Sequence, residues 1–286
     1  MRPKNPLAEV FGFPTDNLDT ETNRYRKNKL CPYNNKVPSC TKDKANDPLG
    51  VCSVFDKEAI AVTCPIRFRQ GWLIAEDAAN FFFPQNSMWT LLTEVRLNDA
   101  DKQSAGNIDI VLVSYDDHGK ITDFGSLEVQ GVYISGNVRL PFEHYIANPS
   151  KNIDLEWPTG QNYPRPDYLS SSRKRLAPQL MYKGGILKHW NKKMAVALDN
   201  SFFTTLPELP AAEEKDADIA WLVYDLIRSK DKNIFELQKV KTVYTSFETA
   251  LDTITTASTG KIGDFIYVLQ NKLDKKLVHH IHDTGG

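Results

Sequence analysis

The chain has 286 residues, of which 41% are hydrophobic and 25% are charged, and its formal net charge is -1. This length provides a complete hydrophobic core for one large domain or two small ones. The near-zero charge identifies no partner, so a nucleic-acid surface would require local clustering of basic residues. The sequence contains no secretory signal and no run of about 18 apolar residues, so we expect a cytoplasmic protein without a membrane span.

Residues 1–65 are rich in Pro, Asn, Asp and Lys and have poor apolar periodicity. This segment contains all the cysteines of the chain, with the spacing C-x8-C-x11-C-x11-C: Cys31, Cys40, Cys52 and Cys64. In a reducing compartment such a cluster favours a metal site, although two disulfides or four unrelated thiols remain alternatives. Zinc and iron both accept four thiolates, and a bound metal would order a segment with so small a core.

The next predicted elements are a helix and a pair of strands. Over residues 87–97 apolar side chains recur at helical spacing and Ser87 is suited to the N-cap, so we expect a helix that carries Glu94. Residues 107–135 contain two apolar runs separated by Asp, His, Gly and Lys at 117–120. This pattern predicts two strands joined by a turn, that is, a hairpin.

The predicted hairpin carries three polar side chains within apolar strands. In NIDIVLV, Asp109 lies on a strand that is apolar on both faces, which indicates a central strand. In SLEVQG, Glu128 and Gln130 share one face, because successive side chains of a strand alternate. A buried carboxylate is costly unless something binds it. If the strands pair, the three groups converge, and the two carboxylates suit a hard cation such as magnesium. The alternative is a buried Asp that caps a turn beside a polar strand edge.

The remaining elements alternate between helices and strands. Residues 168–198 contain seven basic residues and no acid, and the part from 177 to 191 reads as a helix. The further elements that we predict are strands at 194–198, 218–226 and 239–246 and helices at 246–256 and 262–273. This order is typical of an α/β or α+β domain, in which helices flank a mixed sheet.

Taken together, the cysteine segment, Glu94, the Asp…Glu-x-Gln hairpin and the basic helical stretch resemble the NotI-type restriction endonucleases. This family belongs to the PD-(D/E)xK nuclease superfamily, whose usual Lys is replaced here by Gln130. The resemblance runs from the cysteines to about residue 210. It implies a type II site-specific endonuclease with a PD-(D/E)xK core, a central mixed sheet flanked by helices.

The resemblance also implies roles for individual residues. Asp109, Glu128 and Gln130 would be catalytic, with Glu94 as an additional candidate, and Asp109 and Glu128 would bind one or two magnesium ions. Because Gln130 is neutral, it would orient the attacking water instead of accepting its proton. The four cysteines named above would hold a structural ion, which is iron in that family, while zinc remains possible by ligand type.

The basic stretch supplies the DNA-binding candidates of this interpretation. They are Arg173, Lys174, Arg175, Lys183 and Lys188. Such residues neutralise phosphates, and arginines can read guanines in the major groove. The alternative is a solvated surface that is balanced by acids elsewhere in the chain.

The resemblance further implies a homodimer that acts on a palindromic, GC-rich site in double-stranded DNA, in a bacterial cytoplasm, without an organic cofactor. Residues 1–65 would then be a metal-binding segment that contacts DNA, and residues 66–286 the nuclease core with its DNA-recognition elements. Three other functions are compatible with the residues alone. They are a non-catalytic DNA-binding module stabilised by metal, a non-specific or repair nuclease, and a protein whose cysteines sense redox state.

Overall fold

The computed structural model describes residues 5–34, 38–44, 46–154, 156–160, 162–229, 231–257 and 259–283, with side chains described as far as residue 277. The chain divides into two compact units, residues 1–254 and 255–286. The second unit contains the helix α9 (Ile262–Asp283), and the first contains the sheets described below. No helix within the described ranges combines the length and the apolar character that crossing a membrane requires.

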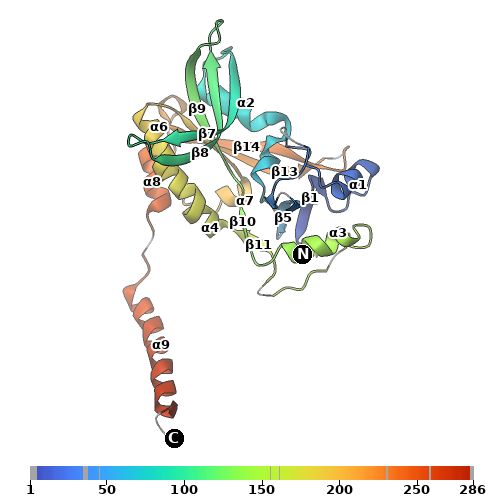
Figure 1. Ribbon diagram of the computed structural model, residues 1–286. Helices are drawn as coiled ribbons and strands as arrows, with labels where there is room; N and C mark the ends of the chain where they lie inside the picture. Colours follow the sequence, from blue (N-terminus) through green and yellow to red (C-terminus); the bar gives the residue numbers. More distant parts are fainter. Residues whose placement is uncertain are drawn as a thin grey trace. The chain divides into compact units, whose positions relative to one another are not determined.

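A mixed six-stranded sheet forms the centre of the first unit, with the strand order β14-β13-β12-β9-β8-β7 (Figure 1). Its strands are β7 (Trp89–Asn98), β8 (Ser104–Tyr115), β9 (Ile121–Gln130), β12 (Met194–Asp199), β13 (Ile219–Arg228) and β14 (Phe235–Thr245). The three central strands β9, β12 and β13 are parallel, and the other strands pair antiparallel. The expected mixed α/β architecture with a central sheet is therefore confirmed.

Helices cover both faces of this sheet. On one face, α2 (Leu73–Phe82) packs against a cluster that includes Ile110 and Leu127. On the other face, a continuous helical run packs with α7 (Asn200–Phe203) and α8 (Phe247–Thr255) around Trp221. The run consists of α4 (Tyr168–Ser171), the π-helical η2 (Ser172–Leu176), α5 (Ala177–Gln179), the π-helical η3 (Leu180–Gly184) and α6 (Gly185–His189). The central strands are apolar on both faces because both faces are covered.

The N-terminal segment has a sheet of its own, with the strand order β2-β1-β5-β6. It comprises β1 (Leu7–Val10), β2 (Phe13–Pro14), β5 (Val51–Asp56) and β6 (Ala59–Val62), and α1 (Thr20–Lys27) and the short pair β3 (Asp43–Lys44) and β4 (Asp47–Pro48) lie between β2 and β5 in sequence. Phe142 and Tyr145 of α3 (Arg139–Ala147) complete its hydrophobic cluster. The segment is thus more regular than its loop-rich composition indicated. The functional boundary at residue 65 stays a prediction.

A buried ion pair joins the two sheets. Glu9 of β1 accepts from Nε of Arg67 at 2.9 Å, and both side chains are fully buried. Arg67 lies in η1 (Pro65–Trp72) and also donates to the backbone carbonyl of Phe235 on β14 at 2.9 Å. A pair this deeply buried is tolerated only when its remaining polar atoms are also bonded. The remaining short elements are β10 (Tyr133–Ser135), β11 (Arg165–Asp167) and η4 (Glu214–Asp216).

The structure confirms the hairpin and corrects the helix that precedes it. β8 and β9 pair antiparallel around a turn in which Gly119 donates to Asp116. The predicted helix over residues 87–97 is wrong, because this segment is the edge strand β7, paired with β8 along its length. Ser87 therefore caps no helix, and Glu94 lies on a strand. The expected helix at 177–191 belongs to the longer run that begins at Tyr168.

Candidate active site

Two carboxylates face each other across the β8–β9 hairpin. Ile110 pairs with Leu127, so that the register sets Asp109 opposite Glu128. The Oδ2 atom of Asp109 accepts a hydrogen bond from the backbone N–H of Val129 at 2.9 Å. The Asp109 and Glu128 carboxyls are also in hydrogen-bonding contact. Two residues that are 19 positions apart in sequence therefore meet at one point of the sheet.

A third carboxylate extends this row onto β7. In the β7–β8 ladder, Thr93 pairs with Ile110 and Val95 pairs with Ile108. Glu94 therefore lies opposite Asp109. Glu94 adopts a φ of 57°, in the left-handed region that is uncommon for residues other than glycine. Such backbone strain persists where the surrounding structure holds it, and functional sites are a common place for it. Glu94 itself is exposed.

Glu128 is fully buried and bound to a lysine. The Nζ atom of Lys183, from η3, lies 2.8 Å from Oε2 and 3.0 Å from Oε1 of Glu128. Burial and then the charge of Asp109 raise the pKa of Glu128, Lys183 lowers it, and the net result is a pKa of about 7. Glu128 is therefore a carboxyl whose charge depends on its immediate neighbours near neutral pH.

Gln130 is two residues after Glu128 on β9, so its side chain lies on the same face of the strand, and it is also buried. Its Nε2 donates to Oε1 of Gln179, on α5 of the helical run. Its own Oε1 is buried and has no hydrogen-bond partner among the described residues. An unpaired buried carbonyl oxygen is costly, so this atom is available to accept a hydrogen bond from a bound molecule.

A cavity of about 230 Å3 adjoins the row of carboxylates. It is lined by Glu94 and Asp109, by basic side chains of three different segments, and by thiols. The basic and thiol-bearing residues are Lys42, Arg69, Arg175, Cys31, Cys40 and Cys64. Two acids beside three cations suit a ligand that carries negative charge and also binds a metal ion.

Three of the four cysteines, Cys31, Cys40 and Cys64, line this cavity, but the four do not form a cluster in the described residues. Burial raises the pKa of Cys31 to about 11, and the neighbouring Cys64 and Cys40 raise it as well. The pKa of the fully buried Cys52 is raised by burial and then by Cys64. All four cysteines are free thiols, so the disulfide alternative is not realised. In the described residues, however, no three His, Cys, Asp or Glu side chains converge closely enough to hold a metal ion.

The five basic residues of the helical run differ in their surroundings. Arg173 and Lys174 are exposed, and Arg175 is half-buried at the cavity. Lys188 donates to both carboxylate oxygens of Asp218, at 2.9 and 3.0 Å. Lys183 is buried against Glu128, which differs from the surface position expected of a phosphate contact. The placement of these two lysines leaves the three consecutive residues 173–175 as the accessible basic group.

Sequence reasoning missed the contribution of the helical run to this site. Gln179 and Lys183 are four residues apart, so they lie on one side of a helix and reach Gln130 and Glu128 respectively. Their spacing is visible in the sequence, but the pairing of this helix with β9 is a tertiary feature. Arg69 was likewise not predicted, since nothing in its local sequence marks it.

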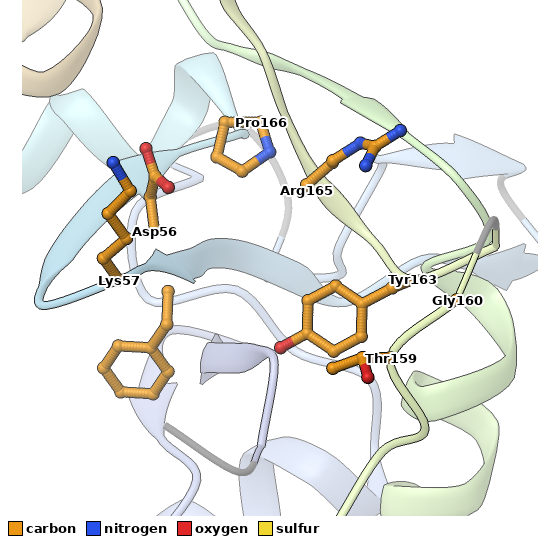
Figure 2. A pocket seen from close by; sticks show the side chains of 8 residues that line it. Asp56, Lys57, Thr159, Gly160, Tyr163, Arg165 and Pro166 are labelled. Atoms are coloured by element: carbon orange, nitrogen blue, oxygen red, sulfur yellow. The ribbon is translucent and has the colours of Figure 1, made fainter. Parts of the chain in front are cut away.

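A second cavity, of about 410 Å3, has no lining residue in common with the first, and Figure 2 shows the residues that line it. It is lined by Asp56 and Lys57 at the end of β5 and by residues of the 159–166 segment, among them Tyr163 and Arg165. The Asp56 carboxylate accepts from the hydroxyl of Tyr168 at 2.7 Å. None of the residues predicted from the sequence lines it, so the cavity beside Asp109 is the candidate active site.

Comparison with known families gives a match over most of the chain. The model of the restriction endonuclease NotI family matches residues 16–237, a span that includes the four cysteines, the carboxylate row, Gln130 and the helical run. No curated protein matches the chain significantly. Since the match covers well over half of the 286 residues, the chain belongs to the NotI restriction endonuclease family of site-specific deoxyribonucleases.

Proposed function

We propose that this restriction endonuclease cuts both strands of a specific, palindromic, GC-rich DNA site in the bacterial cytoplasm, in a magnesium-dependent reaction. The family implies type II restriction and DNA cleavage, and the base composition of the site is an inference from the family alone. The observation that carries the proposal is the row of Glu94, Asp109 and Glu128 across three adjacent strands beside a cavity. A single Asp that caps a turn does not account for this row.

The donor set fits a hard divalent cation. The Asp109 and Glu128 carboxyls are in contact, and their mutual repulsion raises the pKa of Glu128, an effect that a cation between them would relieve. Asp109 and Glu128 would hold magnesium, with Glu94 as a further ligand. When bound, magnesium supplies positive charge at the scissile phosphate and acidifies a coordinated water.

The side chains around the carboxylates orient the reactants. Gln130 has a buried carbonyl oxygen without a partner among the described residues, which suits it to accept a hydrogen bond from the attacking water. An amide does not accept a proton near neutral pH, so the proton of the water passes to solvent or to a substrate phosphate. Arg69 and Arg175 line the cavity and neutralise phosphate charge there.

The four cysteines would hold a structural iron or zinc ion. Support comes from the donor type and from the influence of Cys64, which raises the pKa values of Cys31, Cys40 and Cys52. A metal would bind them as thiolates and order the N-terminal segment. Because three of these cysteines line the same cavity as Asp109, the N-terminal segment would hold this side of the DNA-binding surface in place.

The exposed residues Arg173 and Lys174, together with Arg175, would contact DNA. They lie in one π-helical turn, and Arg175 reaches the cavity. Lys188 would contribute only if it exchanged its partner Asp218 for a phosphate. Cutting both strands of a palindrome requires two symmetric active sites, so we propose a homodimer.

Digestion of plasmid DNA with magnesium, followed by sequencing of the fragment ends, tests this function. We expect discrete fragments whose ends carry one fixed sequence. Random nicking would instead indicate a non-specific or repair nuclease. Retained DNA binding without cleavage would indicate a non-catalytic module, and both of these results contradict the proposal.

A further inference from the structure

Two amide side chains meet where the helical run packs on β9. Gln130 on the strand is fully buried, and its Nε2 donates to Oε1 of Gln179 on α5. The surrounding contacts are apolar, because Leu176 and Leu180 of the run pack in one cluster with Val196 of β12. Polar groups in an apolar interface are costly unless they are bonded, so the presence of this pair requires an explanation.

This hydrogen bond determines which end of the Gln130 amide stays free. A side-chain amide has an acceptor oxygen at one end and a donor NH2 group at the other. Because Oε1 of Gln179 binds the NH2 end, the carbonyl oxygen of Gln130 is left buried and without a partner among the described residues. If both amides were reversed, the free end of Gln130 would be its NH2 group, which donates a hydrogen bond and accepts none.

The fold of the helical run fixes the position of Gln179. Leu176 and Leu180, three residues before it and one after it, are fully buried against the sheet. Pro178 has no backbone N–H to donate, and the π-helical turns η2 and η3 flank α5 on both sides. Such turns are frequent at functional sites. Apolar packing therefore holds Gln179 opposite Gln130 independently of the hydrogen bond between them.

We propose that Gln179 is a positioning residue of the active site, which holds the Gln130 amide with its carbonyl oxygen free to accept a hydrogen bond. In the reaction this oxygen accepts one proton of the attacking water as a hydrogen bond, which orients the water toward the phosphorus. This inference rests on the proposed function, because Gln130 is the residue through which Gln179 acts.

A purely structural pair, which only aligns the run on the sheet, is the competing explanation. Buried polar groups fix the register of packed elements in some proteins. Such a role needs a hydrogen bond across the interface, but either side chain can be the donor. The positioning role instead requires an acceptor at position 179, because a donor there would bind the Gln130 oxygen and withdraw it from the water. The direction of the hydrogen bond therefore separates the two explanations.

The variants for the test change the hydrogen-bonding character of position 179. Gln179→Glu keeps an acceptor, Gln179→Lys offers only donors, and Gln179→Met removes both. The position is half-buried, which admits a charged side chain. Met181→Glu and Met181→Lys are the matched controls, because Met181 lies two residues further along the same run and is 51% exposed. Single-turnover cleavage is measured at saturating magnesium and enzyme, and DNA affinity is measured separately by a gel shift in calcium.

We expect Gln179→Glu to cleave within about five-fold of the wild-type rate and Gln179→Lys to lose about a hundred-fold with little change in DNA affinity. Gln179→Met should lie between them, because its Gln130 amide can take either orientation. A charge effect alone has the opposite sign, because lysine attracts DNA phosphates and glutamate repels them, and the Met181 variants measure it. Equal rates in Gln179→Glu and Gln179→Lys, or a faster Gln179→Lys, would overturn the proposal.

NMR of the metal-free protein without DNA separates this inference from the proposed function. One of the two side-chain NH2 protons of Gln130, assigned with Gln130→Leu, should be shifted downfield in the wild type and in Gln179→Glu, and the shift should be lost in Gln179→Lys. This measurement remains readable if the wild type cuts no DNA and the proposed function fails. If the variants do not fold, the wild-type protein still decides, because a downfield NH2 proton on Gln179 in place of Gln130 would overturn the proposal.

Discussion

Replacing Asp109 by Asn removes one charge from the carboxylate row and keeps the shape of the side chain. The amide oxygen can still accept the hydrogen bond from Val129, now 2.9 Å long. We therefore expect the free energy of unfolding to change by less than about 1 kcal/mol. Because magnesium needs both facing carboxylates, cleavage should fall at least about a hundred-fold, which equals about 2.7 kcal/mol of transition-state free energy.

The same substitution should also lower the pKa of Glu128. This pKa is about 7 because of burial and then the charge of Asp109, with Lys183 opposing them. Without the Asp109 charge, Lys183 acts unopposed by a neighbouring acid, and we expect a decrease of about one unit, measured by 13C NMR. An unchanged Glu128 pKa would show that the two carboxyls do not interact.

Cleavage by the Asp109→Asn variant is measured with plasmid DNA and magnesium. DNA binding is measured by a gel shift in calcium. Asp109→Asn should bind DNA with an affinity close to that of the wild type. The control is Asp123→Asn on β9, because Asp123 is paired with Lys192 and lies outside the cavity. Cleavage by Asp109→Asn at the wild-type rate would contradict this prediction and remove Asp109 from the site.

Cys52→Ser should release or unfold residues 1–65 while the central sheet stays folded, as limited proteolysis and metal analysis would reveal; full metal content in the variant would contradict the structural-metal proposal. Arg67→Met leaves the Glu9 carboxylate buried without its partner, so urea unfolding should reveal a loss of about 3–5 kcal/mol; a wild-type midpoint would be unexpected. Because the pKa of Glu128 is raised in the folded protein, this group stabilises the fold fully at pH values below 4.5, its ordinary pKa. The contribution is lost as the pH rises through about 7. In EDTA the free energy of unfolding should therefore fall by up to about 3 kcal/mol between pH 5 and 8, and magnesium should restore part of it; a rise over this range would argue against a buried Glu128.

The hairpin and its polar residues were predictable because their determinants are local. A turn segment between two apolar runs sets the register, and strand alternation then sets Glu128 and Gln130 on one face. Asp109 follows from the same register. The apolar runs also predicted strands at the positions of β12, β13 and β14, with boundaries that differ by a few residues.

β7 was predicted wrongly because helical and strand spacings overlap in its sequence. Leu91 and Val95 suit a helix, but polar residues also occur at alternate positions, namely Thr90, Glu94 and Arg96, and several residues between them favour strands. Pairing with β8 decides between the two patterns, and a long-range partner is invisible in a local window. The error also concealed why Glu94 lies near Asp109, which is the register of an edge strand.

The buried position of Lys183 beside Glu128 was missed for a different physical reason. A basic residue on a helix is usually solvated, and its seven-charge neighbourhood favoured a DNA surface. Its burial arises from the packing of the helical run on the sheet, through residues such as Leu180 and Leu187. Only this packing brings the ammonium group to Glu128.

We propose that this chain is a magnesium-dependent, site-specific nuclease whose catalytic residues lie on β7, β8 and β9. Sequencing both ends of every fragment from a digest of a random-sequence DNA library tests it most directly. We expect one palindromic sequence at all ends, dependent on magnesium and absent from the Asp109→Asn digest. Ends without a common sequence, or the same cleavage by Asp109→Asn, would contradict it.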